Sequence, residues 1–286
     1  EIGVRLVGSE MCIRDRLTVP TGEYSTGPIE LCSNMELHLE PGAVIRFLND
    51  PAAFPLQECQ YEGRISHRPK PCLSAFNAEN VALTGFGVLD GCGAPWWAAQ
   101  RARTLANGRP YLLHFENVTH LRVCGVQLRN SPAWTVHPLN CVDVLIEDVS
   151  ICNPYNSPNT DGINPESCRD VRILNCRVDV GDDCITLKSG TEETPSPAPC
   201  ENIVIANCLL VHGHGGIVIG SEMSGGVRNV TVTNCVFTGT DRGLRVKTRR
   251  RRGGCVENLR LSNLVMERVF CPFVFNMYYS LSLIHI

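Results

Sequence analysis

The sequence lacks a marked excess of charge of either sign. Its 286 residues hold 26 Lys and Arg against 29 Asp and Glu, which gives a formal net charge of -3. General binders of nucleic acid or of anionic membrane surfaces usually carry a clear positive excess. No apolar run approaches the roughly 20 residues that a membrane-spanning helix needs. We therefore expect neither nucleic acid nor a membrane among the partners of this protein.

The sequence also lacks the ligand spacings of a zinc site. It holds no CxxC pair and no tight cluster of Cys and His, so we predict no metal and no cofactor. Its 16 cysteines mostly lie in apolar, strand-like segments such as "RILNCRV", "IANCLLV" and "VTNCVF". We interpret them as reduced, buried residues that act as small hydrophobes rather than as disulfides. This interpretation favours a reducing cytoplasm over secretion, and nothing else in the sequence fixes the compartment.

The two ends of the chain are related at the level of DNA. One DNA string can encode "MCIRDR" at residues 11–16, and its reverse complement can encode "LSLIHI" at residues 281–286. The string resembles an adapter used to prepare sequencing libraries. We therefore interpret residues 1–16 and 281–286 as non-native scars. We predict a single catalytic domain over residues 17–280 that is truncated at both ends.

Helix signals are nearly absent, whereas one seven-residue pattern recurs along the chain. Its first residue is polar, and apolar residues follow at its second, fourth and seventh positions. This alternation predicts a β-strand. Successive full copies begin 23 to 40 residues apart, which favours the coils of a parallel β-solenoid. The copies begin at Asn34 in a weaker form, and at Asn80, His120, Asp143, Asp170, Asn202, Asn229 and Asn258.

The alternative all-β fold is a sandwich of β-hairpins. It requires two-residue turn signals between adjacent strands. Such signals do not lie between these copies. We therefore predict an all-β, single-stranded parallel β-helix.

Stacking in a solenoid brings residues that are distant in sequence close together in space. Equivalent residues of neighbouring coils lie about 4.8 Å apart. The second strand of each coil aligns as "TDGINPE", "DDCITLK", "HGGIVIG" and "DRGLRVK". This alignment stacks Asp161 on Asp183 and puts Asp182 in one column with His214. The shared apolar column holds Ile163, Ile185, Ile217 and Leu244.

Two further consequences follow from strand geometry. Arg245 and Lys247 lie two residues apart on one strand, so they face the same side. Strict alternation would send Asp182 and Asp183 to opposite faces. We therefore expect the backbone to bend there, next to Gly181.

One coil earlier, the segment "SPAWTVHP" holds two further candidates. We align Trp134 with the apolar column of Ile163 and interpret it as core packing, with sugar stacking as the alternative. His137 then aligns with Glu166 and becomes a candidate for a substrate subsite.

Three carboxylates in one cleft form a site with a particular chemistry. Like charges raise one another's pKa, so one carboxyl group can hold its proton near neutral pH. An acid and a base in one cleft meet the requirement for cleaving a glycosidic bond. The alternative is that these Asp residues simply cap solenoid turns.

Four short blocks of the sequence resemble those of a known family. "NTDG" at residues 159–162, "GDD" at 181–183, "GHG" at 213–215 and "RVK" at 245–247 resemble the signature blocks of the polygalacturonase (pectinase) family of glycoside hydrolases. They occur in the order and approximate spacing of that family. The resemblance implies a right-handed, pectin-lyase-like parallel β-helix. It also implies metal-independent, inverting hydrolysis of α-1,4-linked galacturonic acid in pectin, in polygalacturonate or in its oligomers. We expect the protein to be a monomer.

The resemblance also implies roles for individual residues. The general acid would be Asp182, and Asp161 with Asp183 would position and deprotonate the attacking water. Val246 stands where the family usually has Ile, a mild departure. The remaining expected roles are support of the acid by His214, binding of the substrate carboxylate by Arg245 and Lys247, orientation of Asp161 or the sugar by Asn159, and a substrate-binding tyrosine at Tyr278, with Tyr279 as the alternative.

Two other functions remain open at this stage. One is a β-helical polyuronate lyase that uses Ca²⁺ and an Arg base, and the other is a β-solenoid that binds glycans without cleaving them. The run "KTRRRRGG" at residues 247–254 is the most basic stretch of the chain. It is compatible with a solvated turn or with attraction of a polyanionic sugar, whereas nucleic-acid binding is disfavoured because no aromatic residues are interleaved.

Overall fold

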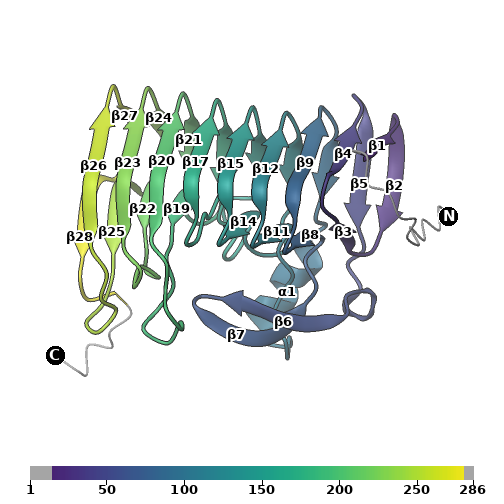
Figure 1. Ribbon diagram of the computed structural model, residues 1–286, viewed down its shortest axis with the longest axis horizontal. Coiled ribbons are helices and arrows are strands. Elements are labelled where there is room, and N and C mark those ends of the chain that lie inside the picture. Colours follow the sequence, from purple (N-terminus) through teal and green to yellow (C-terminus); the bar gives the residue numbers. More distant parts are fainter. Residues whose placement is uncertain (1–14, 280–286) are drawn as a thin grey trace.

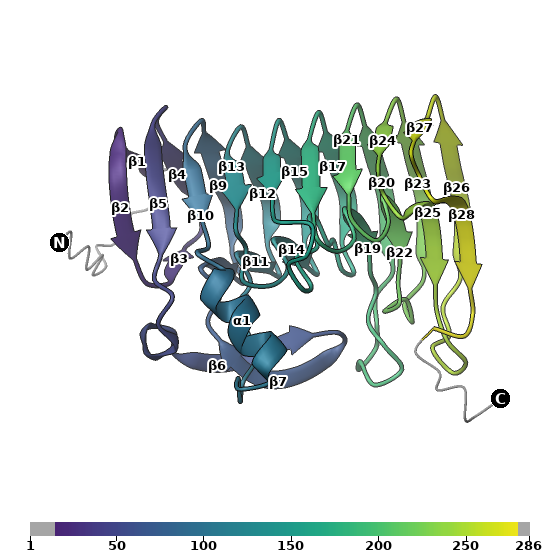
Figure 2. The same cartoon turned by 180° about the vertical axis from the view of Figure 1, so that it is seen from behind.

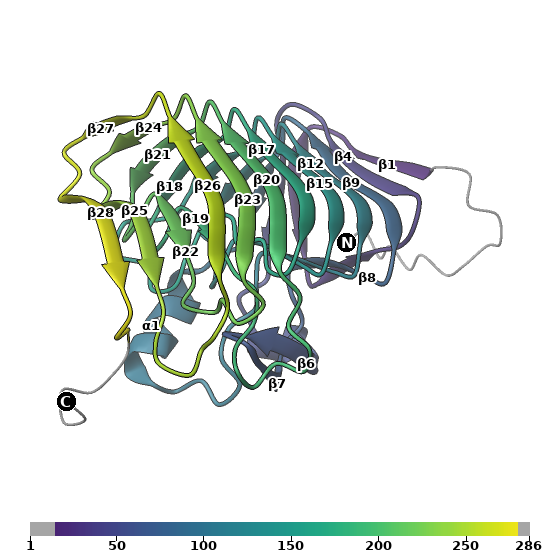
Figure 3. The same cartoon turned by 60° about the vertical axis from the view of Figure 1, so that its left-hand side comes forward.

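The computed structural model describes residues 15–279, and its fold is a right-handed parallel β-helix. The chain winds through three parallel sheets, which we call sheets A, B and C (Figures 1 and 2). Figure 3, turned toward the last coils, shows the sheets arranged around a common interior. One continuous apolar core fills that interior. The prediction of an all-β parallel β-helix is therefore confirmed.

Eight of the nine strands of sheet A are built from the seven-residue repeats, and β1 precedes the first of them. In the repeat that begins at Asp170, Val171 and Ile173 are fully buried, whereas Arg172 between them is exposed. Alternate residues thus supply the core, as the period-two pattern predicts. The nine strands of sheet A, in order along the axis, are β1 (Asp15–Val19), β4 (Met35–Leu39), β9 (Glu79–Gly85), β12 (Thr119–Cys124), β15 (Val142–Glu147), β17 (Arg169–Leu174), β20 (Cys200–Ala206), β23 (Val227–Thr233) and β26 (Val256–Ser262).

Sheet B follows sheet A in each coil. The repeat pattern does not distinguish this sheet, because most of its strands have only three or four residues, too few to show a period. Its nine strands, in order, are β2 (Gly22–Thr26), β5 (Ala43–Phe47), β10 (Val88–Asp90), β13 (Gln127–Arg129), β16 (Ser150–Cys152), β18 (Arg177–Val180), β21 (Leu209–His212), β24 (Val236–Thr238) and β27 (Val265–Glu267).

Sheet C completes each coil and consists of two four-stranded parts. Isolated bridges from Ile163 to Val136 and to Ile185 join the two parts. The first part contains β3 (Ile29–Leu31), β8 (Leu73–Phe76), β11 (Leu113–Glu116) and β14 (Val136–Leu139), and the second contains β19 (Ile185–Leu187), β22 (Ile217–Ile219), β25 (Arg242–Lys247) and β28 (Cys271–Asn276).

The polar residue that opens each repeat has a left-handed backbone. All eight of these residues, from Asn34 to Asn258, have φ between 53° and 62°. Asn adopts this conformation more readily than most residues. Many of the side chains also form a ladder between coils: the Asn229 amide donates to Asn202 Oδ1 at 3.0 Å, and the Asn258 amide donates to Asn229 Oδ1 at 3.1 Å. The ladder therefore fixes both the turn and the register of adjacent coils.

Two insertions leave the coils between sheets B and C. The first holds the short 3₁₀ helix η1 (Pro51–Ala53) and an antiparallel hairpin of β6 (Leu56–Tyr61) and β7 (Arg64–Pro69). The second holds α1 (Ala94–Ala102), which starts with a proline in its first turn and buries Trp96 and Trp97. Figure 2 shows both insertions outside the coils, along one edge of the solenoid.

All described cysteines are free thiols. Many of them pack in the interior, as the sequence analysis predicts, and burial raises the pKa of several of these thiols, Cys200 to about 12. The buried ones are Cys59, Cys72, Cys141, Cys168, Cys176, Cys184, Cys200, Cys208 and Cys235.

The expected scars lie mostly outside the described residues. Asp15 and Arg16, the last two residues of the first expected scar, pair with β4 as part of β1. At the other end of the solenoid, Phe273 and Phe275 of β28 are 58% and 66% exposed. Among the described residues, no helix is both long enough and apolar enough to cross a bilayer.

The ladder leads to a prediction about stability. We expect Asn229→Ala to lower the free energy of unfolding by roughly 1–2 kcal/mol, because Ala is strained at positive φ and makes no ladder bond. Asn229→Gly should lose less, since glycine accepts this backbone conformation. Denaturant unfolding followed by circular dichroism measures both changes. An Asn229→Ala protein as stable as the wild type would show that the ladder contributes nothing.

Candidate active site

The register of sheet C brings the predicted acidic residues together. Ile163 pairs with Ile185, as the sequence alignment predicts. Asp161 and Asp183 each lie two residues before this column. Gly162 N donates to Asp183 O at 2.9 Å, so the two segments are hydrogen-bonded neighbours on adjacent coils.

The expected bend at Asp182 and Asp183 is present. Both residues precede β19, which begins at Ile185, so strand alternation does not apply to them. Asp183 N–H donates to Asp182 Oδ1 at 2.9 Å. A Cβ atom on Gly181 would lie 2.4 Å from the Ser157 carbonyl oxygen, so only glycine fits this close approach.

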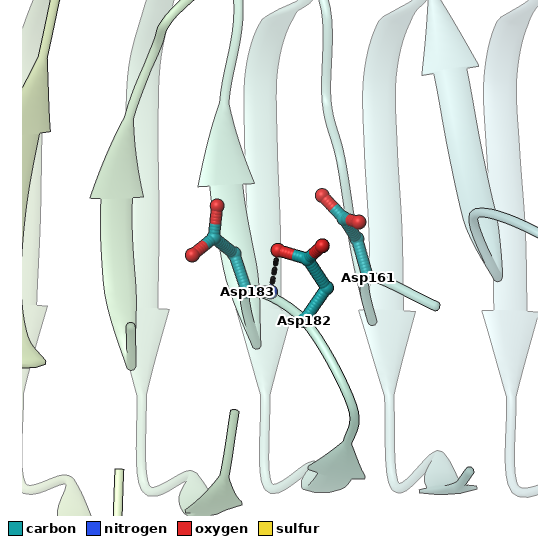
Figure 4. A group of neighbouring side chains, drawn as sticks. All are labelled: Asp161, Asp182 and Asp183. Carbon is teal, nitrogen blue, oxygen red and sulfur yellow. Dashed lines mark hydrogen bonds between the residues drawn. The ribbon is translucent and has the colours of Figure 1, made fainter. Parts of the chain in front are cut away.

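The carboxylates of Asp161, Asp182 and Asp183 form one cluster, which we call the acidic triad (Figure 4). One oxygen of each carboxylate lies within 4.8 Å of one oxygen of each of the others. Asp161 and Asp183 are 4% and 0% exposed. The Asp182 side chain is 18% exposed, so it is the member of the triad most open to solvent.

Two cations hold Asp183. Lys247 Nζ donates to Asp183 Oδ2 at 2.6 Å, and Arg245 Nη1 donates to Oδ1 at 3.5 Å. The two cations therefore face the same side of β25, as predicted. Burial opposes the charge on Lys247, but the Asp183 carboxylate outweighs burial and raises the pKa of this lysine.

Asp161 and Asp182 titrate in opposite directions. Burial, followed by the negative charge of Asp182, raises the pKa of Asp161 well above its ordinary value. Burial also opposes ionisation of Asp182, but the hydrogen bond and charge of His214 outweigh it and lower the pKa of Asp182. His214 Nδ1 lies 3.4 Å from Asp182 Oδ1, and this contact raises the pKa of His214. Of the two carboxylates, Asp161 is therefore the one that holds a proton more readily.

Asn159 lines the site but is not bonded to Asp161. Its Oδ1 atom accepts a hydrogen bond from Arg109 Nη2 at 2.6 Å. The residue that contacts Asp161 is Asn164, whose amide donates to Asp161 Oδ2 at 3.1 Å. The sequence analysis missed Asn164, although it lies three residues after Asp161 in the quoted block "TDGINPE".

Of the two candidate tyrosines near the end of the described residues, Tyr279 lines the pocket and Tyr278 does not. Tyr279 lines the pocket, and its ring lies 5.1 Å from Lys247 Nζ and 5.5 Å from the Arg245 guanidinium. Tyr278 is 56% exposed and contacts only Arg250 among the described cations. Both tyrosines follow the end of β28, where strand alternation no longer decides which side chain turns inward.

The predicted alignment of Trp134 is wrong by two residues. Val136 pairs with Ile163, so Trp134 is level with Asp161. Trp134 is 2% exposed and its ring stacks on Tyr61 at 4.8 Å, yet it also lines the pocket beside Asp161. The hairpin that supplies Tyr61 explains why an aromatic residue on this outer face is covered.

The same shift changes the assignment of His137. Leu139, not His137, pairs with Glu166. His137 Nε2 nevertheless lies 3.0 Å from Glu166 Oε2, and its Nδ1 lies 3.0 Å from His114 Nδ1. His137 is fully buried, which lowers its pKa to about 4, and it does not line the pocket. It is therefore part of a buried polar network and not of a substrate subsite.

Two members of the acidic triad, Asp161 and Asp182, line a pocket of about 540 Å³, whereas Asp183 is fully buried beside them. The β6–β7 hairpin supplies Arg64 and its neighbours to one side of this pocket. Thr191 Oγ1 donates to Gly63 O at 3.2 Å, and Arg64 Nε donates to Glu193 Oε2 at 3.1 Å. The tip of the hairpin is thereby joined to the loop that follows β19. The hairpin lies outside the repeat pattern, so the sequence did not predict this wall.

Comparison with known proteins identifies the family. Residues 12–282 match Glycosyl hydrolases family 28. The chain belongs to glycosyl hydrolase family 28. It is 33% identical over 261 residues to a probable polygalacturonase of Vitis vinifera, covering 88% of this chain and 53% of the relative. It is 30% identical over 273 residues to an endo-polygalacturonase of Pectobacterium carotovorum subsp. carotovorum, covering 90% of this chain and 66% of the relative.

Solved structures of family 28 enzymes agree with this fold. The crystal structure of a hyperthermoactive exopolygalacturonase from Thermotoga maritima superposes with a TM-score of 0.80 at 35% identity. That match covers 92% of this chain and 68% of the other. The chain thus spans about half to two thirds of the length of these curated relatives, and it contains the segment that carries the acidic triad.

The family 28 pocket also contains a buried ion pair that the sequence analysis missed. Lys188 Nζ donates to Glu222 Oε2 at 2.6 Å and lies 4.5 Å from the Trp134 ring centroid. Burial opposes both charges, but each residue stabilises the other. As a result, the pKa of Lys188 is raised and the pKa of Glu222 is lowered to about 2. Lys188 is the last residue of the block "DDCITLK", but nothing in the sequence indicates that it pairs with Glu222.

The ion pair predicts a pH-dependent loss of stability. We expect Glu222→Gln to lower the free energy of unfolding at neutral pH by roughly 3–5 kcal/mol, because it leaves the buried Lys188 charge uncompensated. The lowered pKa of Glu222 means that its contribution is complete above pH 4.5, its ordinary pKa, and is lost as the pH falls toward about 2. The difference between the wild type and Glu222→Gln should therefore shrink over this interval.

Denaturant unfolding at a series of pH values measures this difference. The double variant Lys188→Met with Glu222→Leu is the control, since removing both charges should recover much of the loss. A pH-independent difference would contradict the ion-pair assignment.

Proposed function

We propose that this chain hydrolyses α-1,4-linked galacturonic acid in polygalacturonate, pectin or their oligomers. The observation that carries the proposal is the acidic triad, three carboxylates clustered within 4.8 Å beside Arg245 and Lys247. The family 28 match and the relatives named polygalacturonases support the reaction class. The substrate is an acidic polysaccharide, so cations beside the acid groups suit it.

The triad supplies both proton transfers of glycoside hydrolysis. Asp182 donates a proton to the glycosidic oxygen as the bond to the anomeric carbon breaks. Asp161 and Asp183 hold a water molecule, whose oxygen bonds to the anomeric carbon while its proton passes to one of the two carboxylates. The Asp182 side chain is the most open to solvent, which suits the group that meets the leaving oxygen.

The proton needed by Asp182 is stored within the triad. Asp161 is the member of the pair that favours holding it, because its pKa is raised whereas that of Asp182 is lowered. We infer that binding of a negatively charged sugar, which excludes water from the pocket, moves this proton to Asp182. His214, which contacts Asp182, then orients the acid. The proton that the water gives up to the triad restores the starting state after turnover.

Arg245, Lys247 and Tyr279 bind the carboxylate of the sugar next to the cleaved bond. Lys247 retains donors beyond its bond to Asp183, and Arg245 Nε is buried without a hydrogen bond among the described residues. A guanidinium group can grip a carboxylate through two hydrogen bonds. Tyr279 closes the same side of the pocket.

The stereochemical outcome is proposed from the family resemblance and not from the spacing of the carboxylates. Inverting enzymes commonly separate their two carboxyl groups by roughly 6.5–9.5 Å. The closest oxygens of the triad lie within 4.8 Å, which is shorter. Inversion in this site therefore requires that two carboxylates of the triad together hold the water, instead of a single base far from the acid.

A Ca²⁺-dependent polyuronate lyase is the second candidate. The observation that favours it is the triad itself, because three carboxylate oxygens within 4.8 Å can hold a divalent cation. Hydrolysis is the better supported of the two because the matched family is a family of hydrolases.

One assay separates these functions. Incubated with polygalacturonate in the presence of a chelator, the protein should release reducing ends without new ultraviolet absorbance. Proton NMR should show β-configured ends first, since inversion of an α-linkage gives the β-anomer. Absorbance from a new double bond, abolished by the chelator, would establish the lyase. Binding without any product would establish a glycan-binding protein.

The acid role of Asp182 is tested through the leaving group. We expect Asp182→Asn to lower kcat on polygalacturonate at least about 100-fold, with an unchanged circular dichroism spectrum. In an aryl α-galacturonide the leaving group is a phenolate, which departs without needing a proton. The Asp182→Asn variant should therefore cleave this substrate at close to the wild-type rate. Asp161→Asn is the matched control and should be impaired on both substrates. The opposite pattern would make Asp161 the acid.

A further inference from the structure

The basic loop after β25 contains four consecutive arginines, residues 249–252, which lie in two different environments. Arg249 and Arg252 line the pocket. Arg250 and Arg251 are exposed on the outside of the loop. A turn that served only solubility would show no such division, so the two inward arginines require an explanation of their own.

Arg252 is the most unusual of the four. It is 6% exposed, and its Nε and Nη1 atoms are buried without a hydrogen bond among the described residues. The nearest carboxylates are Glu192, with Oε2 3.0 Å from Nε, and Glu222, with Oε1 4.0 Å from Nη1. Nε thus forms an ion pair with Glu192 without hydrogen-bond geometry, whereas Nη1 has no acceptor within hydrogen-bond distance among the described residues. A buried donor without an acceptor is costly, and an anion in the pocket would satisfy it.

Arg249 reaches the same point from the loop surface. Its Nη2 donates to Glu192 Oε1 at 2.6 Å, and its side chain is 30% exposed. Glu192 therefore lies between the two arginines in the absence of a ligand. A guanidinium group has five donors, so each arginine can bind a second carboxylate while it keeps this contact.

These arginines are separate from the cations beside the acidic triad. Arg245 and Lys247 lie on β25 and contact Asp183. Arg249 and Arg252 lie beyond the end of β25, and their acidic contacts are on the loops that follow β19 and β22. Arg249 and Arg252 thus form a separate pair of cations in the pocket, and the proposed chemistry at the triad does not explain them.

We propose that Arg249 and Arg252 form a second carboxylate-binding subsite, which holds another uronate residue of the same chain. This proposal rests on the proposed function, because it takes a polyuronate as the ligand. It predicts that the protein recognises the charge on two sugars, one at each pair of cations. A chain of acidic sugars would then bind more tightly than the contacts at the triad alone allow.

The test measures the Kd of trigalacturonate by titration calorimetry in an Asp182→Asn background, which prevents turnover. We expect Arg249→Gln to weaken binding about tenfold or more, the usual effect of losing a hydrogen bond between charged groups. Arg250→Gln removes the same charge from the same loop and should change Kd less than about twofold. If Arg249→Gln and Arg250→Gln change Kd equally, the loop acts only by long-range electrostatic attraction, and the proposed subsite is wrong.

Glu192→Gln distinguishes ligand binding from a structural role of the arginines. If the arginines serve only to hold the loop of Glu192, this variant should weaken binding as much as Arg249→Gln does, and that result overturns the proposal. If they bind the ligand, Glu192→Gln frees them, and binding should be unchanged or tighter. These outcomes do not depend on catalysis: wild-type protein that releases no product, together with this pattern of Kd values, would refute the proposed hydrolysis and support the subsite.

Discussion

The hydrogen-bonded spacing of parallel strands, about 4.8 Å between coils, is the constraint on which the rest of this structure depends. It fixes where every side chain of sheet C lies relative to the coil before and after it. Asp161 and Asp183 are 22 residues apart in sequence and become neighbours only through this spacing. The asparagine ladder on sheet A and the apolar core hold the register, so the geometry of the acidic triad is a consequence of packing far from the pocket.

The same spacing brings charged side chains close together on the outer face of sheet C. There, two buried lysines each form an ion pair with a carboxylate. Lys247 is paired with Asp183, and Lys188 is paired with Glu222. Asp161 accepts a hydrogen bond from the Asn164 amide and has no ion pair among residues 15–279, and burial together with the charge of Asp182 raises its pKa. This difference in partners gives three identical carboxyl groups different affinities for a proton.

Sequence analysis predicts the elements that repeat and fails where the repeat is interrupted. The seven-residue pattern predicts sheet A, and the four blocks predict the triad with its two cations. The predicted register of Trp134 is wrong by two residues, because Val136 and not Trp134 pairs with Ile163. Beyond the end of β28, strand alternation does not distinguish Tyr279 from Tyr278. The β6–β7 hairpin and the partners Asn164 and Glu222 depend on tertiary contacts that no local period encodes.

The most direct test of this account is a titration of the aspartate carboxyl carbons by ¹³C NMR in the free protein. The account predicts one resonance that titrates well above the ordinary Asp pKa of about 3.9, because three clustered carboxylates cannot all ionise freely. That resonance should disappear in Asp161→Asn. If every aspartate titrates at or below its ordinary pKa, the triad does not share a proton, and the proposed source of the catalytic acid is wrong.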